Sequence, residues 1–397
     1  MKRFSIILLG ALAMLMASCS KDVHTASKEP ESNDWLVNLD LPVPIQFNAG
    51  GLETKAAFSS MDELLSTASK QYPFGIFAIN KSAETINDDD LLLNNERALY
   101  IENEGNKEFR FMNSGNPPVE QPKYYPMVSD RSYDFYGYYS RKNTIELSES
   151  ESTPTRVSVN VAVASLDSDI LWAKASTGAG EDGYHAKYIR KHPDQKPTLN
   201  FSHVTSCLQF RAVYSPKDGE TASEMEDINV SSITLKQLNK TAKLCVIDLD
   251  DPDNEGQLSV TGEKSDVLIS GTSTPKTNLI TSKDGNNYIP AEICDDFFIA
   301  PQDEALEVQF VIKYTPVGGT ALSQAVSYTL DPSKLGASVN DKGEIEDEDG
   351  NVIRLFEANY KYGFNIKIYS PEQIRIDVTL ESYKDAFTGG YADIVIE

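Results

Sequence analysis

Cys19 is the residue whose type and position point most directly to a chemical modification. It follows an apolar stretch, Phe4–Ala17, that begins after Lys2 and Arg3 and gives way abruptly to a polar sequence. A stable membrane-spanning helix needs about 20 apolar residues, so this stretch is too short to be an anchor. The basic start and the short apolar run instead predict an export signal with a single cysteine at its end.

The letters MASC around this cysteine resemble the lipobox of bacterial lipoproteins. The resemblance implies cleavage between Ser18 and Cys19, a thioether-linked lipid on Cys19 and acylation of the new N-terminus. Several acyl chains attach a protein firmly to a membrane, at roughly 0.8 kcal/mol per buried methylene. The alternative is a plain signal peptide that contains a cysteine, which is less expected because the chain has only 4 cysteines. We therefore expect a signal peptide over 1–18 and a polar tether over 19–34.

No residue pattern in the chain assembles a catalytic or cofactor site. Gly178, Gly180 and Gly183 match the dinucleotide fingerprint G-x-G-x-x-G, but that fingerprint requires a buried strand before it and a helix after it. Glu181 and Asp182 would repel the phosphate and no helical pattern follows, so a flexible loop is expected. No zinc-helix motif, G-x-S-x-G elbow or C-x-x-C pair occurs either.

Acidic residues and one histidine leave weaker alternatives. The sequence DPDNEG at 251–256 is similar to the start of a calcium loop, but Gly262 stands where the bidentate glutamate should be. A solvated turn is the favoured interpretation, and calcium binding stays open. A carboxylate pair for glycoside hydrolysis also stays open, because nothing singles out two of the 60 acidic residues. His203 lies in a strand-like stretch, which favours a structural role. We expect no enzyme and no cofactor.

Composition limits the partners and the redox chemistry. The chain has 60 acidic and 36 basic residues and a net charge of −24, which argues against nucleic acid or anionic lipid as a partner and favours solubility. Beyond Cys19, the cysteines are Cys207, Cys245 and Cys294. An odd number cannot all pair, so we expect buried apolar thiols rather than a disulfide framework.

Hydrophobic and polar residues alternate along much of the chain. This period of two predicts strands with one buried face, and hence antiparallel sheets packed on a core. It is clearest at 157–163, 306–314, 360–368 and 374–380. Helical spacing is limited to short patterns at 61–71 and 88–97.

The length of 397 residues suits two domains of about 150 to 200 residues each. The stretch at about 174–200 mixes glycine, charge and proline without a period, which indicates a loop or linker. The expected fold is therefore all-β, with two antiparallel β-sandwich domains over 35–200 and 201–397 and few short helices.

Five stretches, in this order, resemble the fimbrillin-like family of lipoproteins, the pilin subunits and pilus accessory proteins of certain Gram-negative anaerobes. They are the lipobox, PIQFNAGGLETKAAF, YPMVSDRSYDFYGYYSR, the pair SDILWAKAS and LNFSHVTSCLQFRAVY, and FEANYKYGFNIKIY with the strand after it. The resemblance implies transthyretin-like topology for both sandwiches and a place on the outer membrane, at the cell surface and in the fimbrium. The tyrosines expected to pack the N-terminal core and its edges are Tyr124, Tyr125, Tyr133, Tyr136, Tyr138 and Tyr139.

The resemblance also implies a maturation step. In the family, a trypsin-like protease cuts after a basic residue in the first loop and the N-terminal strand leaves. A strand of another subunit then fills the groove by donor-strand exchange. Mapped here, the strand lies within 35–55 and the cut follows Lys55, with glycines at 50–51 as a flexible cleavage loop. Pro42 and Pro44 cannot donate ladder hydrogen bonds, which suits a sheet edge.

Two features depart from the family pattern. The best-studied maturation uses arginine, whereas this chain has Lys55, so either the protease differs or the strand is never removed. The C-terminal run YADIVIE is brief for a donor strand, which would suit a cap or anchor. The last strand of the second sandwich is the favoured interpretation of this run.

We predict a structural or adhesive fimbrial subunit, attached to outer-membrane lipid through Cys19 and joined to other pilin subunits. The alternatives are a pilus anchor or tip protein, and a lipid-anchored module that binds a glycan or protein of a host or bacterial surface without polymerising. An enzyme is a third and weaker alternative, because no catalytic set is assembled.

Overall fold

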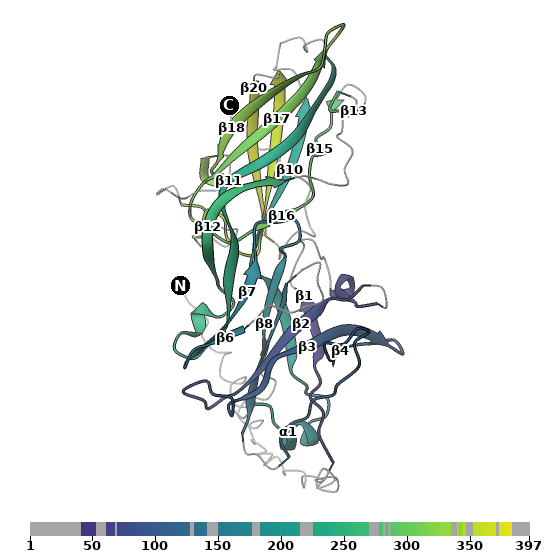
Figure 1. Cartoon of the computed structure of the whole chain (residues 1–397), viewed down its shortest axis with the longest axis vertical. Helices are drawn as coiled ribbons and strands as arrows, with labels where there is room; N and C mark the ends of the chain where they lie inside the picture. Colours follow the sequence, from purple (N-terminus) through teal and green to yellow (C-terminus); the bar gives the residue numbers. More distant parts are fainter. Residues whose placement is uncertain are drawn as a thin grey trace, which may run out of the picture. The chain divides into compact units, whose positions relative to one another are not determined.

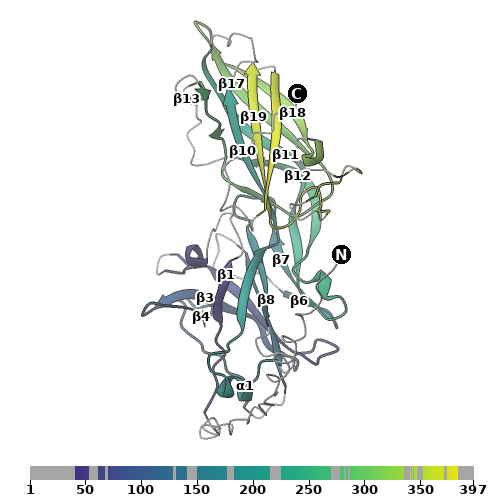
Figure 2. The ribbon, with the colours of Figure 1, turned by 180° about the vertical axis from the view of Figure 1, so that it is seen from behind.

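The computed structural model describes residues 41–52, 61–67, 70–127, 131–140, 150–176, 183–214, 225–269 and 278–382, the last range with short gaps. The gaps lie at 281–282, 285–286, 335–339, 341, 343, 347–351 and 371–372. The described residues from Pro42 onward form one compact unit. Most of them belong to strands (Figures 1 and 2).

Within the described residues the strands form three larger sheets and one small one. A seven-stranded sheet has the order β1 (Asn48–Leu52), β9 (Thr198–His203), β8 (Ile170–Ser176), β5 (Tyr133–Ser140), β2 (Pro73–Asn80), β3 (Leu91–Asn103) and β4 (Asn106–Phe111). A five-stranded sheet has the order β15 (Ala291–Glu292), β10 (Ser206–Tyr214), β19 (Tyr360–Ser370) and β20 (Gln373–Ser382), with β16 (Phe297–Ile299) also paired to β10.

A six-stranded sheet follows the path β18 (Leu322–Leu330), β17 (Leu306–Pro316), β11 (Met225–Asp248), β7 (Arg156–Ala162) and β6 (Ser150–Ser152), with β12 (Leu258–Ile269) also paired to β11. The small sheet pairs β13 (Lys283–Asp284) with β14 (Asn287–Tyr288). In the described part of the chain the helices are α1 (Ala186–Lys191) and the 3-10 turns at Met61–Leu64, Pro252–Asn254 and Pro332–Lys334.

The central strand β2 buries both of its faces. Phe74 and Ile76 contribute to one hydrophobic cluster, the N-terminal core, whereas Phe77 and Ile79 contribute to a second cluster, the middle core. The neighbouring strand β5 divides its aromatic residues between the two cores in the same way. A strand buried on both faces needs a nearly continuous apolar run rather than alternation, and the sequence PFGIFAIN of β2 supplies it.

β11 is long enough, at 24 residues, to contribute to two cores. Its first half places Ile228, Ile233 and Leu235 in a third cluster, the C-terminal core, which also contains residues of β10 and β19. Its second half places Leu244 and Val246 in the middle core. Figure 1 shows β11 as one long strand, which pairs with β17 along its first half and with β7 along its second half.

β7 and β17 pair with the same edge of β11, one after the other. Residues 233–235 of β11 pair with both β17 and β12, and residues 241–244 pair with both β7 and β12. A strand has only two edges, so β12 lies on the edge opposite to both of the other partners. β12 therefore spans the interval between β17 and β7.

Gln237 lies in that interval and has an unusual backbone conformation, with φ 54. The carboxylate of Asp266 on β12 accepts hydrogen bonds from the backbone N of Gln237 at 3.3 Å and from Nζ of Lys236 at 2.8 Å. The hydrogen bond from Lys236 is the largest cause that lowers the pKa of Asp266. The carboxylate of Asp266 thus stabilises the irregular backbone conformation of Gln237.

The strands expected from the period of two are present as β7, β17, β19 and β20. An all-β fold with few helices is confirmed. Two strand pairs, β1 with β9 and β10 with β19, are parallel, which the alternation did not predict. In each pair the two strands are separated by a long stretch of sequence, which leaves room for the crossover that parallel pairing needs.

Both helical patterns are corrected by the structure. At 61–71 only Met61–Leu64 is helical, because the backbone N of Ser66 donates a hydrogen bond to the carbonyl of Tyr100 at 2.8 Å. At 88–97 the chain enters strand β3, which pairs with β2 and β4. Pairing of residues 91–97 with β2 outweighs the local preference for helix.

The stretch at 174–200, expected to be a loop, contains the end of β8, the helix α1 and the start of β9. The ring of His185 caps α1 by accepting a hydrogen bond from the backbone N of Tyr188 at 3.3 Å. Ala186 and Tyr184 are buried in the N-terminal core. Tertiary packing and one cap thus form a helix that has no clear periodicity in the sequence.

The boundary expected at residue 200 stays a prediction. The six-stranded sheet combines β6 and β7 from one side of that position with β11, β12, β17 and β18 from the other, so the two halves of the chain share a sheet. The expected signal peptide and tether lie outside the described residues. None of the helices in the described part of the chain is long and apolar enough to cross a bilayer.

Replacing Gly256 by alanine should destabilise the protein. Gly256 has φ 80, and a Cβ added there would lie 2.8 Å from Cε3 of Trp172. Left-handed backbone strain and overpacking together should lower the free energy of unfolding in urea by about 2–5 kcal/mol. Gly318→Ala is the matched control, since Gly318 has φ 72 and no atom within 4 Å of the added Cβ. Equal losses in the two variants would contradict the role of Trp172.

Candidate functional site

Residues 41–48 form an extended segment that packs alternate side chains into the N-terminal core. Val43, Ile45 and Phe47 are buried in that core, whereas Pro44 and Gln46 are exposed. The sequence VPIQF thus has the period of two of a strand with one buried face. The three apolar side chains are the main attachment of the segment to the rest of the protein.

Two backbone hydrogen bonds join this segment to the chain at 123–125. The backbone N of Ile45 donates to the carbonyl of Lys123 at 2.8 Å, and the backbone N of Tyr125 donates to the carbonyl of Val43 at 3.0 Å. Pro44 lies opposite residue 124 in this short antiparallel bridge, and a proline has no N–H to donate. The ladder on this side is therefore short.

β1 continues the segment at the end of the seven-stranded sheet, where β9 is its one partner among the strands that the structure describes. The pairing begins with a hydrogen bond from the backbone N of Asn48 to the carbonyl of Pro197 at 2.9 Å. The prediction that this strand lies at a sheet edge is confirmed. The glycines at 50–51, expected in a flexible loop, belong to β1.

The side chain of Phe47 is surrounded by three other phenylalanine rings. Its centroid lies 6.2 Å from that of Phe109, 6.0 Å from that of Phe111 and 5.4 Å from that of Phe135, each in an edge-to-face arrangement. Such pairs contribute about 0.5–1.5 kcal/mol beyond the burial of their area. The cavity that Phe47 would leave is therefore lined by aromatic rings and fits an apolar side chain.

The tyrosines expected around the N-terminal core follow the prediction. Tyr125, Tyr133 and Tyr139 are buried in it, and Tyr136 and Tyr138 are buried in the middle core. Tyr124 is the exception, with 48% of its surface exposed at the edge of the bridge to the N-terminal segment.

His203 forms a buried hydrogen bond with Asp169, in which Nδ1 of the ring faces a carboxylate oxygen and both side chains are fully buried. The two residues lie in the two parts of the fourth resembling stretch, at the start of β8 and the end of β9. The structural role expected for His203 agrees with this position. Sequence reasoning missed its partner, because nothing in the spacing of the two residues shows that they meet.

Cys207, Cys245 and Cys294 are free thiols in buried positions, as predicted. Burial raises the pKa of Cys245 to about 11 and that of Cys294 to about 12. Since the thiolate is the reactive form, these two residues are unreactive near neutral pH.

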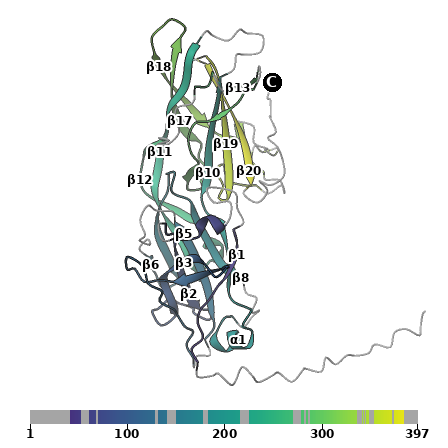
Figure 3. The same cartoon turned by 90° about the vertical axis from the view of Figure 1, so that its right-hand side faces the viewer.

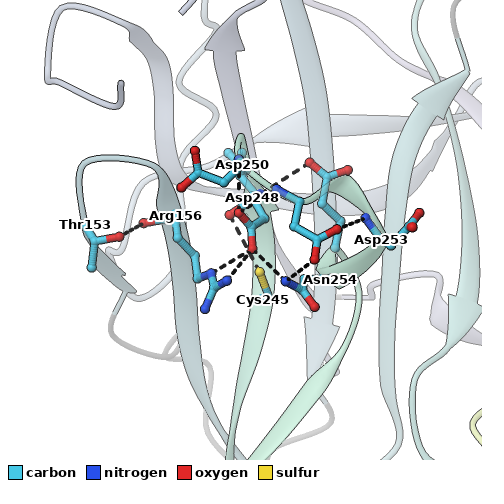
Figure 4. A network of polar contacts seen from close by, with 10 residues as sticks. Thr153, Arg156, Cys245, Asp248, Asp250, Asp253 and Asn254 are labelled. Atoms are coloured by element: carbon cyan, nitrogen blue, oxygen red, sulfur yellow. Dashed lines mark hydrogen bonds and ion pairs between the residues drawn. The ribbon is translucent and has the colours of Figure 1, made fainter. Parts of the chain in front are cut away.

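The acidic turn at 251–256 forms a network of internal hydrogen bonds (Figure 4). The carboxylate of Asp251 accepts from the backbone N of Asp253 at 3.3 Å and from Nδ2 of Asn254 at 3.1 Å. That of Asp248 accepts from Nε of Arg156 at 2.9 Å and from Nδ2 of Asn254 at 3.2 Å. These oxygens stabilise the turn itself.

Glu255 shows that the turn is not simply solvated. Its side chain is only 4% exposed and lies 2.8 Å from Nζ of Lys174 on β8. It also accepts a hydrogen bond from the hydroxyl of Tyr136 on β5 at 3.0 Å. The turn after β11 is thereby fixed to the seven-stranded sheet.

The described part of the chain contains no group of three or more histidine, cysteine, aspartate or glutamate residues placed to hold a metal ion. Of the glycines in the dinucleotide-like fingerprint, Gly183 precedes Tyr184 with φ 65, and Gly178 and Gly180 lie outside the described residues. Cys19, Lys55 and the C-terminal run at 391–397 also lie outside them.

The fimbrillin-like family matches residues 45–382 of the chain. This match starts at the buried N-terminal segment and ends with β20. The chain belongs to the fimbrillin-like family. Among curated proteins, none matches this chain.

Several solved structures show similarity to this chain over most of its length. One is a candidate cell adhesion protein from Bacteroides uniformis, with 15% identity, a TM-score of 0.45 and coverage of 87% of this chain and 98% of that chain. Another is a candidate cell adhesion protein from Bacteroides ovatus, with 13% identity, a TM-score of 0.42 and coverage of 86% and 98%. A third is the fimbrial anchor protein Mfa2 from Porphyromonas gingivalis, with 10% identity, a TM-score of 0.34 and coverage of 86% and 98%.

Replacing Phe47 by alanine should weaken the attachment of the N-terminal segment. Loss of a buried aromatic ring lowers the free energy of unfolding by about 3–5 kcal/mol, which urea unfolding measures. Hydrogen exchange at the backbone N–H of Ile45 and Tyr125 should also accelerate. Gln46→Ala, at the exposed neighbouring position, is the control and should change the free energy of unfolding by less than about 0.5 kcal/mol. A loss for Phe47→Ala no larger than for this control would contradict the packing described.

Asp248→Asn should make the free energy of unfolding less dependent on pH. Burial acts to raise the pKa of Asp248, but hydrogen bonds from Arg156 and Asn254 outweigh it, so the pKa lies below its usual value. The stabilisation is therefore complete above the unfolded pKa, about 4, and is lost as the pH falls through the lower folded value. We expect the variant to lose about 1–3 kcal/mol at neutral pH and to approach the wild type below pH about 4.

Urea unfolding between acidic and neutral pH measures this difference. Asp250→Asn, at an exposed carboxylate two residues away, is the control and should unfold like the wild type throughout. A constant difference between Asp248→Asn and the wild type at every pH would show that the charge of Asp248 is not involved.

Proposed function

We propose that this protein is a cell-surface fimbrial subunit that joins other subunits by exchanging its N-terminal strand. The observation that carries the proposal is the attachment of residues 41–48. This segment fills part of the N-terminal core, yet it lies at a sheet edge and has a short backbone ladder. Its departure would break no strand pair inside the sheet. Membership of the fimbrillin-like family supports the proposal.

Removal of the segment would open an apolar groove along the N-terminal core. Burial of a side chain such as Val43, Ile45 or Phe47 contributes about 1.5–3 kcal/mol, and an empty groove would lose all three contributions. A strand from another subunit with apolar side chains at alternate positions would restore them. It could also pair with the backbone at 123–125 and with β9, which makes the interaction a β-augmentation.

The cut that frees the segment is proposed to follow Lys55, three residues after β1 ends at Leu52. The new N-terminus would be Ala56. The strand would then be held only by the side chains and backbone bonds described above. Because Pro42 and Pro44 lack an N–H, an incoming strand without prolines could form a longer ladder than the one it replaces.

Attachment to the cell is proposed to come from lipid on Cys19. The apolar run and the letters MASC support this assignment, and the polar stretch at 20–34 would then tether the folded unit to the outer membrane. The role that we propose is structural or adhesive rather than catalytic.

A second candidate function is a pilus anchor, a tip protein or a surface-binding module that does not polymerise. The observation that favours it is a departure from the family pattern, Lys55 in place of arginine. In such a protein the N-terminal strand would stay in place, or the groove would accept a strand from a different protein.

Limited digestion with a trypsin-like protease tests the proposal. Cleavage of the purified precursor should give a product that begins at Ala56 by N-terminal mass mapping, and a ladder of multimers on a gel run without boiling. Lys55→Arg should keep both results. Lys55→Ala should abolish both, because the strand then has no point of release.

The outcomes separate the candidate functions. Cleavage after Lys55 that leaves only monomers would contradict self-polymerisation and favour a cap or tip that needs a strand from another protein. Resistance at Lys55 in a folded precursor that is cut elsewhere would favour an anchor or a non-polymerising module.

A further inference from the structure

β18 is an edge strand that lacks charge. It forms one end of the six-stranded sheet and, among the described residues, pairs with β17 alone (Figure 3). No aspartate, glutamate, lysine or arginine occurs between Lys313 and Asp331, although 24% of the residues in the chain are charged. An edge strand presents backbone N–H and C=O groups that can pair with another chain.

The other edge strands of the described sheets that are longer than β1 carry charges or bulges, which prevent such pairing. β4 contains Lys107, Glu108 and Arg110, and β20 contains Arg375, Asp377 and Glu381. β12 contains Glu263, Lys264 and Asp266, and its register with β11 shifts twice. Charges and bulges of this kind are ordinary protection against edge-to-edge association.

β18 has none of these features. Its nine residues contain no proline, and its register with β17 runs without a shift from Leu322, opposite Tyr314, to Leu330, opposite Leu306. A straight, regular and uncharged edge is the form that accepts a further strand most readily.

The side chains of β18 fit a further strand on the same sheet. Val326 and Tyr328 are half-buried and pack against the C-terminal core, whereas Ala325 and Ser327 are exposed and small. The turn before β18 adds apolar surface, with Val317 57% exposed and Leu322 47% exposed. A strand placed beside β18 would extend the sheet and cover part of this surface.

A second copy of β18 in the antiparallel direction is complementary to the first. With Val326 placed opposite Val326 of the second copy, Ala325 lies opposite Ser327 and Gln324 opposite Tyr328. The outer pairs are then Ser323 with Thr329 and Leu322 with Leu330. Similar residues face each other in the Val–Val, Leu–Leu, Ala–Ser and Ser–Thr pairs, and no like charges meet, which would otherwise destabilise cross-strand pairs.

We propose that β18 is an interface between two copies of this chain, which pair antiparallel about Val326 and join their six-stranded sheets. The net charge of −24 opposes association over most of the surface. The uncharged edge is the place where two copies can approach without that repulsion. Such a two-fold interface is self-complementary and closes on itself, so it yields dimers rather than open chains.

The interface is independent of the proposed strand exchange. It uses residues 322–330, which contribute to the C-terminal core, and neither the N-terminal segment nor Lys55 takes part. The uncleaved precursor should therefore associate through β18 before any protease acts. Failure of strand exchange and failure of this association are thus separate results.

Sedimentation of the purified full chain without protease tests the proposal. The wild type should be a reversible dimer whose dissociation depends on concentration and little on salt. Ala325→Lys together with Ser327→Lys should weaken association about tenfold or more, because lysines of the two copies would then face each other twice. Ala325→Lys together with Ser327→Glu should keep the dimer, since opposite charges then face each other in the same register.

Gln257→Lys together with Ser259→Lys is the control, since it adds the same charge at exposed positions of the same spacing near the start of β12. It should associate like the wild type, and all variants should match the wild type in circular dichroism and urea unfolding. A wild type that stays monomeric would overturn the proposal, as would equal association of the wild type and the double-lysine variant. Equal weakening by the Lys–Lys and Lys–Glu variants would overturn the pairing about Val326.

Discussion

β11 pairs with β17 and with β7, and it supplies apolar side chains to two cores. Its first half pairs with β17 and contributes to the C-terminal core, and its second half pairs with β7 and contributes to the middle core. The middle core in turn supports the inner faces of β2 and β5, whose other faces form the N-terminal core. The arrangement of the seven-stranded sheet, and of the segment at its edge, therefore depends on this one strand.

The N-terminal segment occupies a limited place in this arrangement. Val43, Ile45 and Phe47 belong to the N-terminal core and to neither of the other two. The contacts between Glu255, Lys174 and Tyr136 fix the seven-stranded sheet to the end of β11 from its other face. Loss of the segment would thus expose one face of one sheet while the remaining cores keep their contacts. Because the segment contributes to one core only, its loss would leave the packing of the other two cores unchanged.

The sequence predicts strands well where one face of the strand is buried. It predicts them poorly where pairing with a neighbouring strand determines the conformation. Val159 and Phe310 follow the period of two and lie in β7 and β17. The residues at 88–97 have local helical spacing, yet pairing with β2 holds residues 91–97 in β3. The contact of His203 with Asp169 and the parallel pairing of β10 with β19 join distant residues. Such partners leave no local pattern, so a single sequence does not reveal them.

The position of β12 has a mechanical consequence. A force that separates the C-terminal core from the middle core acts along β11, which contributes to both. Because β12 overlaps both β17 and β7 on the opposite edge of β11, that force loads the hydrogen bonds of this ladder in shear. Bonds loaded in shear must break together rather than one at a time. The overlap therefore lets the ladder of β12 share with the backbone of β11 a force that acts on the joint between the two cores.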